Sequence, residues 1–212
     1  TDINDILHTV LTEASDDLLL VDPTEEAIQA LIDVATEFDG ELPTIRMLAE
    51  ERPIKETMED FLVASRAADL IDAGQLSIRL LADPAANALL VSEDSVLALV
   101  SAGDRIAALS TDDAGFIESA RESYDDRWEA ADAYHLRTPP LSQVRETLGS
   151  DIGETAREDF DAVLADLDTA RGDGEGLDEV TISLLVAAKN EVLLYDISKW
   201  GEDVGIASKA TF

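Results

Sequence analysis

The sequence predicts an α/β fold: an N-terminal mixed sheet covered by helices, followed by a smaller, all-α C-terminal region. Within the first 82 residues, three short apolar runs alternate with amphipathic segments, which favours parallel strands joined by helices. Three further apolar runs follow, separated by acidic or glycine-containing turns, which is typical of an antiparallel meander. After Pro139-Pro140 no strand-like run recurs.

The first half is expected to form a strand–helix–strand–helix–strand unit preceded by a helix. Residues 3–14 carry apolar side chains at helical spacing. The runs at 17–21, 44–49 and 76–82 are typical of buried strands. Thr24 is placed to cap a helix that extends to Phe38 and stops at Gly40. A second helix is expected over 54–73, closed by Gly74.

The second half divides into a meander, a long helix and a helical tail. We expect strands at 87–92, 95–101 and 105–109, and a helix over 114–134. Shorter helices are expected at 141–148, where Gly149 would end the helix, and at 154–171, 178–190 and 192–201. The predicted domains are an α/β sensor or dimerisation domain at 1–137, a helical connector and linker at 138–176, and a partial winged helix-turn-helix at 177–212.

The charge balance is extreme, with 47 acidic against 15 basic residues and a formal net charge of −32. Because apolar residues make up 46% of the chain and keep their periodicity, disorder is a poor explanation. Adaptation to molar salt fits better, since brine screens the self-repulsion. We therefore expect a protein of an extreme halophile. The same salt weakens counterion release, so the acidity argues only weakly against DNA as a partner.

Few residues point to catalysis. The chain lacks cysteine, which excludes disulfides, thiolate nucleophiles and cysteine-based zinc sites. His8 and His135 have no second ligand at helical spacing, and no phosphate-binding glycine motif is present. No apolar run reaches the roughly 18 residues of a membrane span, and Thr1 opens no signal pattern. We expect a cytoplasmic protein with no catalytic residue, metal, cofactor or membrane partner.

The tail at 193–212 has the pattern of a helix-turn-helix. An amphipathic helix is followed by Gly205 as a turn residue and by Ile206 as an apolar plug, and Ser208 is suited to cap a second helix. The second helix of such a unit presents its first residues to the major groove. An ordinary helical hairpin remains the alternative. The chain stops at Phe212, where the second helix begins, so we expect a longer natural protein if this interpretation holds.

Four blocks resemble haloarchaeal regulators of the TbsP type, which are related in outline to the TrmB sugar-responsive regulators. They are DLLLVDPTEEAI at 17–28, LLADPAANALLVSEDSVLALV at 80–100, DDRWEAADAY at 125–134 and the tail at 193–212. The resemblance implies a phospholipase D-like domain joined to a helix-turn-helix. Active phospholipase D domains carry H-x-K-x-x-x-x-D. Here Asn87 and Leu89 replace the His and Lys while Asp94 keeps the Asp, so the resemblance implies a sensor or dimerisation domain and not a phosphodiesterase.

The favoured function is that of a transcriptional regulator, not an enzyme, that binds double-stranded promoter DNA as a homodimer and senses a small metabolite. The residues expected to contact DNA are Ser208, Lys209 and Thr211, with Lys199 on phosphate. An effector would bind at the carboxyl ends of the parallel strands. The candidates there are Asp22, Thr24, Glu50, Arg52 and Asp83. Two alternatives stay open: a halophilic α/β enzyme that uses this same pocket for a small phosphorylated or sugar substrate, and a scaffold that only pairs with another protein.

Overall fold

The computed structural model describes residues 2–14, 16–102, 105–170, 178–208 and 210–212. The chain divides into two compact units. The N-terminal unit comprises Thr1–Glu59 and Leu70–His135, and the C-terminal unit comprises Asp60–Asp69 and Leu136–Phe212. The second unit is therefore assembled from two separate stretches of sequence.

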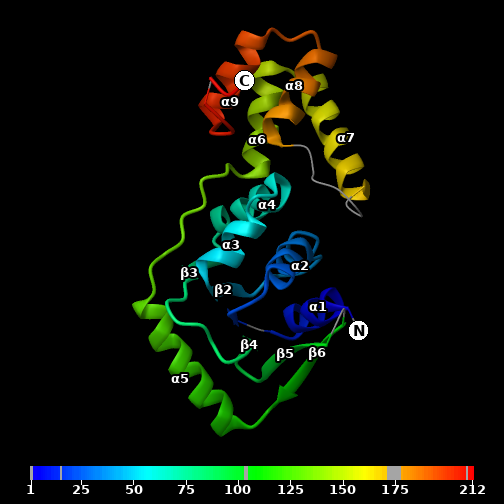
Figure 1. The fold of residues 1–212 in the computed structure, drawn as a ribbon. Coiled ribbons are helices and arrows are strands. Elements are labelled where there is room, and N and C mark those ends of the chain that lie inside the picture. Colours follow the sequence, from blue (N-terminus) through cyan, green and yellow to red (C-terminus); the bar gives the residue numbers. More distant parts are fainter. Residues whose placement is uncertain (1, 15, 103–104, 171–177, 209) are drawn as a thin grey trace. The chain divides into compact units, whose positions relative to one another are not determined.

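The N-terminal unit is built on one six-stranded mixed sheet, with strand order β3-β2-β1-β4-β5-β6 (Figure 1). β1, β2 and β3 are parallel, whereas β4, β5 and β6 form an antiparallel meander that joins β1 through β4. The predicted α/β fold class is confirmed. The strands are β1 (Asp17–Val21), β2 (Thr44–Ala49), β3 (Leu76–Leu80), β4 (Ala88–Val91), β5 (Val96–Ala102) and β6 (Arg105–Thr111).

Helices cover both faces of this sheet, as Figure 1 shows for α1 and α2 on one side of β4–β6 and α5 on the other. Alternate strand residues point to opposite faces. Leu19 and Val21 pack with α5 in a buried cluster that includes Trp128, while Leu18 and Leu20 point to the other face and are fully buried. The helices of the first 135 residues are α1 (Ile3–Glu13), α2 (Glu25–Thr36), α3 (Glu51–Thr57), α4 (Phe61–Asp72) and α5 (Ala114–Ala130).

Two helix predictions for the first 135 residues were wrong in their bounds. The single helix expected over 54–73 is two helices, α3 and α4, because the Asp60 carboxylate accepts hydrogen bonds from the backbone N–H groups of Leu62 and Val63 and so begins a new helix. The helix expected over 114–134 ends at Ala130. The residues after it pair with β3 instead, where Leu80 donates to the Asp132 carbonyl at 2.8 Å.

From residue 141 onward the described part of the C-terminal unit consists of helices and turns and has no strand, as predicted. Besides the part of α4 that belongs to this unit, its helices are α6 (Leu141–Thr147), a π-helical turn (Leu148–Ile152), α7 (Glu154–Ala170), α8 (Glu179–Lys189) and α9 (Leu194–Val204). Gly149 does not end the first of them, contrary to expectation, because the π-helical turn continues to Gly153, whose φ of 140° ends it. The linker predicted at 172–176 lies outside the described residues.

A charged network fixes α5 to the sheet of the N-terminal unit. Arg46 on β2 forms ion pairs with Asp17 at 2.6 Å and with Asp125 at 2.7 Å. The guanidinium groups of Arg46 and Arg79 lie 5.5 and 4.9 Å from the centre of the Trp128 ring. Burial by itself would lower the pKa of Arg46, but hydrogen bonds to Asp125 and Asp17 outweigh it and hold that pKa above its usual value.

Because Trp128 is only 6% exposed and lies at the centre of this network, Trp128→Ala should lower the free energy of unfolding by about 3–5 kcal/mol. Phe116→Ala, also on α5 but at a side chain that is 52% exposed, should cost far less. Urea unfolding followed by circular dichroism measures both. Equal losses for the two variants would contradict this account of the α5 contact.

Candidate nucleic-acid interface

α8 and α9 form a helical pair joined by a tight turn. Asp178 caps α8, because its carboxylate accepts from the Thr181 backbone N–H at 2.7 Å. That backbone hydrogen bond is the largest cause that holds the pKa of Asp178 below its usual value. After α8 the chain turns through Glu191, whose φ of 55° is left-handed, and α9 begins at Leu194. α8 and α9 are thus two helices joined by a short turn.

α9 spans Leu194–Val204 and so ends three residues later than the helix expected over 192–201, and Gly205 follows it as the predicted turn residue. Gly205 takes a left-handed φ of 89°, which glycine adopts without steric cost. The Ile206 backbone N–H donates to the Gly201 carbonyl at 2.9 Å, and the Ile206 side chain is buried in the core of the unit. A left-handed glycine followed by an apolar contact is a common helix stop. It redirects the chain toward Ser208.

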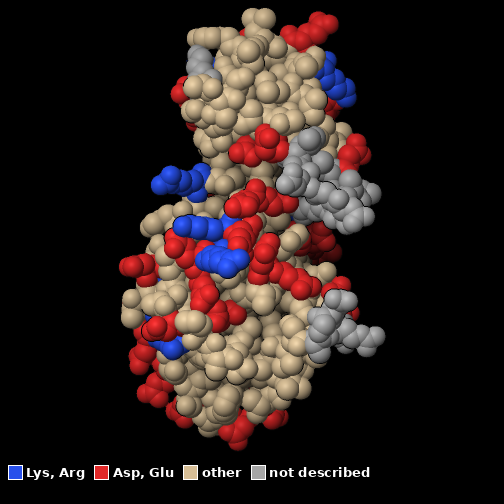
Figure 2. Space-filling model, viewed as in Figure 1, with Lys and Arg blue, Asp and Glu red and all other residues tan. Residues whose placement is uncertain are grey.

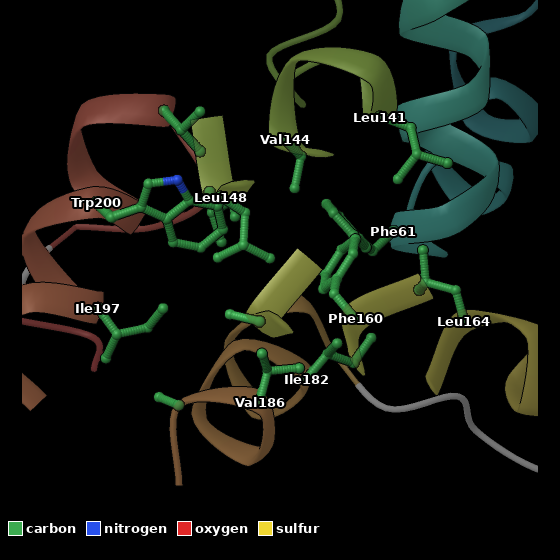
Figure 3. Close-up of a cluster of buried hydrophobic side chains, with 14 of the residues drawn as sticks. Phe61, Leu141, Val144, Leu148, Phe160, Leu164, Ile182, Val186, Ile197 and Trp200 are labelled. Carbon is green, nitrogen blue, oxygen red and sulfur yellow. The ribbon is translucent and has the colours of Figure 1, made fainter. Parts of the chain in front are cut away.

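The core beneath these helices is apolar and draws on every helix of the unit. Figure 3 shows Phe61 of α4 beside Phe160 of α7 in the interior, and Trp200 of α9 beside Leu148. The indole N–H of Trp200 donates to the Thr147 hydroxyl at 3.1 Å. Trp200 thereby fixes the orientation of α9 against α6.

A second polar contact holds the end of α8. The Asp159 carboxylate of α7 pairs with the Lys189 ammonium at 2.7 Å and accepts from the Asn190 side-chain amide at 2.8 Å. These hydrogen bonds, that of Lys189 first, hold the pKa of Asp159 below its usual value. These contacts hold the last residue of α8 and the first residue of the following turn against α7.

Of the four residues predicted to contact DNA, three belong to the described part of the chain, and they lie at two places. Ser208 and Thr211 are exposed, and they form a turn in which the Thr211 N–H donates to the Ser208 carbonyl and the two hydroxyls are 2.8 Å apart. Lys209 lies outside the described residues. Lys199 is exposed on α9 and lines a hollow of about 380 Å³ whose other charged residues are acidic. Those acidic residues are Asp151, Glu191, Asp196 and Asp203.

Residue 212 lies on α9. A Cβ added at Gly201 would collide with the ring of Phe212, so the absence of a side chain at Gly201 leaves the space that this ring occupies. This contact joins the end of the described chain to the helix that precedes the Ser208 turn. Sequence reasoning did not identify it, because Gly201 within a helix carries no local signal of a distant contact.

The five residues predicted to hold an effector follow β1, β2 and β3. Three of them, Asp22, Thr24 and Arg52, make contacts with nearby protein groups. The Asp22 carboxylate accepts from the Ala85 backbone N–H at 2.7 Å, and the Thr24 hydroxyl caps α2. Arg52 pairs with Glu56 on α3. The Glu50 side chain makes no cap hydrogen bond, and Asp83 is exposed. The structure thus links Asp22 to the loop that contains Asp83.

Two hollows in the N-terminal unit are lined by other residues. One, of about 690 Å³, is bordered mainly by carboxylates and includes Asp94, and the other, of about 500 Å³, includes Asn87 and Leu89. Among the described residues no group of His, Cys, Asp and Glu is placed to hold a metal ion. None of the helices in the described part of the chain has the length and apolarity needed to cross a membrane.

The Asp178 cap gives a pH-dependent prediction. Asp178→Ala should lower the free energy of unfolding by about 1 kcal/mol near neutral pH, and Asp178→Asn, which keeps a cap, by much less. Because the folded pKa is lowered, the carboxylate stabilises the fold above its unfolded pKa of about 3.9 and loses this effect as the pH falls. Urea unfolding across this pH range checks it. A wild type–alanine difference independent of pH would contradict it.

Comparison with known proteins covers the whole chain. Residues 1–139 match the family model of the N-terminal domain of TbsP-like transcriptional regulators, and residues 140–212 match that of their C-terminal helix-turn-helix domain. No curated protein matches. Among solved structures, TrmBL2, described as an archaeal chromatin protein with a novel mode of DNA binding, is 15% identical with a TM-score of 0.43. The match covers 62% of this chain and only half of that one. On the two family models, the chain belongs to the TbsP-like transcriptional regulators.

Proposed function

We propose that this chain is a transcriptional regulator that binds double-stranded promoter DNA through its C-terminal helices. The observation that carries the proposal is the family match over 140–212, which falls on a helical unit in which α9, the Gly205 stop and the Ser208 turn follow one another. In a helix-turn-helix, the residues that begin the second helix contact base edges. We assign Ser208 to that position, where the described residues form a turn instead of the second helix that the sequence predicts.

Ser208, Lys209 and Thr211 are proposed to contact DNA, with Lys199 on a phosphate. The exposed Ser208 and Thr211 hydroxyls support this assignment, because hydroxyls hydrogen-bond both phosphates and bases. Lys199 and Lys209 are the two lysines that follow the α8–α9 turn. The acidic residues around Lys199 would oppose a phosphate at low ionic strength.

High salt would screen the repulsion between these carboxylates and a phosphate. We propose that the protein works in a halophilic archaeon, where the salt concentration is high. Figure 2 shows acidic side chains spread over the viewed face, in accord with the net charge of −32. At 1 M salt the Debye length is about 3 Å, so the carboxylates near Lys199 act only on their immediate neighbours. DNA binding would then depend mainly on hydrogen bonds and shape, with little counterion release.

The N-terminal unit is proposed to act as a catalytically inactive sensor of a small metabolite in the cytoplasm. Its site would include Asp22, Thr24, Glu50, Arg52 and Asp83, at the carboxyl ends of the parallel strands. Positions that follow neighbouring strands of one parallel sheet gather at one edge, which supports this placement. The regulator is proposed to be a homodimer, since helix-turn-helix proteins bind paired half-sites.

Charge reversal at the two proposed lysines tests the DNA contact. Lys209→Glu should weaken binding to a promoter fragment that the wild type selects by about tenfold or more, and Lys199→Glu should weaken it less. Lys55→Glu, the same charge change on exposed α3, should leave the affinity unchanged. Fluorescence anisotropy in about 2 M KCl measures all three. If both tail variants bound as the wild type does, the assignment would be wrong.

A further inference from the structure

The two edges of the N-terminal sheet differ in whether another segment forms backbone hydrogen bonds with them. At the β3 edge, Leu80 donates to the Asp132 carbonyl at 2.8 Å and Tyr134 donates to the Ile78 carbonyl at 2.9 Å, so the segment after α5 covers that edge. At the opposite edge, no backbone hydrogen bond within the described residues joins β6 to any segment other than β5. The outer side of β6 is therefore available for pairing.

Residues 106–111 of β6 also lack three of the features that normally prevent pairing, namely charge, proline and a bulge. Native edge strands are usually protected by charged side chains, proline, bulges or covering segments. Residues 106–111 read IAALST, with neither charge nor proline, in a chain whose residues are 29% charged. The register of β5 with β6 runs without interruption from Val96↔Thr111 to Ala102↔Arg105, so no bulge bends the strand away. An open, regular and uncharged edge is a template for another strand.

Apolar side chains border the same edge. Val100, Leu109 and Phe116 are 42, 66 and 52% exposed. Val100 is paired with Ala107 and Ala98 with Leu109, which places these side chains on the face of the sheet that α5 covers. Leu109 and Phe116 line the hollow of about 500 Å³ on that face. Exposed apolar patches of this kind mark sites of association.

We propose that a second copy of this chain pairs with β6 in an antiparallel, two-fold arrangement centred on Ala108, which joins the two sheets into one. Hydrogen-bonded and non-bonded pairs alternate along an antiparallel ladder. A two-residue connection between Ala102 and Arg105 places the bonded pairs at 105, 107 and 109. Residues 106, 108 and 110 then direct their backbone groups outward, and pairing about Ala108 satisfies all three.

The same register places small and large side chains of the two copies opposite one another. Ala108 lies opposite the second copy's Ala108, and Leu109 lies opposite its Ala107 and diagonal to its Leu109, where large side chains still meet. In this register the uncharged residues 106–110 of the two copies lie opposite one another. At low salt two copies that each carry −32 repel one another except where an uncharged surface such as residues 106–111 lets them approach.

A single cysteine tests the register, because the chain has none of its own. Bonded pairs have Cα atoms about 5.5 Å apart, within the span of a disulfide. Ala108→Cys should therefore give a disulfide-linked dimer under mild oxidation. Ser77→Cys, exposed on the covered β3 edge, should remain monomeric on a denaturing gel. Equal cross-linking of the two variants would overturn the proposal.

Sedimentation equilibrium of the 212-residue chain in about 2 M KCl, without DNA, measures whether the chain dimerises through the β6 edge. The wild type should dimerise, and Leu109→Arg, which places two cations diagonally across the axis, should raise the dimer dissociation constant tenfold or more. Leu185→Arg, at a leucine of α8 that is 49% exposed, is the matched control and should have no effect. A monomeric wild type, or a dimer unaffected by Leu109→Arg, would contradict it. Since no DNA is present, this result is independent of the DNA-binding proposal.

Discussion

The C-terminal unit depends on apolar packing between stretches that are far apart in the sequence. Phe61 and Leu62, at the start of α4, are buried in the same cluster as Phe160 and Trp200. Asp69 accepts from both the backbone N–H and the hydroxyl of Ser142, at 3.1 and 2.6 Å. Residues 60–69 are thus part of the helical core, although the family boundary falls at 139–140. A fragment that begins at residue 140 would leave this core open, because it lacks two of the core's buried side chains.

Electrostatics constrain the molecule in a different way, because its few cations are shared among many carboxylates. Arg46 forms ion pairs with both Asp17 and Asp125, and Lys189 forms an ion pair with Asp159. Such pairs fix geometry at particular points, whereas the surplus acidic charge repels any other copy or nucleic acid at low salt. Association must then take place at neutral surfaces or in brine that screens the charge. The β6 edge offers a neutral surface of this kind, and the DNA binding proposed for the helical tail with Ser208 would take place in brine.

Much of the sheet could be predicted from the sequence, since β1 and β2 are apolar runs bounded by polar residues and occupy the predicted ranges. The stop of α9 at Gly205 was also predictable, because a left-handed position favours glycine. The division between α3 and α4 was missed, since the Asp60 cap lies within one amphipathic pattern. The assignment of Phe61 to the C-terminal core could not have been found, because tertiary packing leaves no periodic signal. The residues assigned to DNA and effector remain predictions.

The central claim is that an acidic chain binds specific DNA through its helical C-terminal unit in high salt. The most direct test is selection of fragmented genomic DNA from the source organism by the chain, with any residues that its reading frame encodes after Phe212, in about 2 M KCl. The account predicts enrichment of a small set of promoter fragments over coding fragments of the same length. Retention of no fragments, or of all fragments equally, would contradict it.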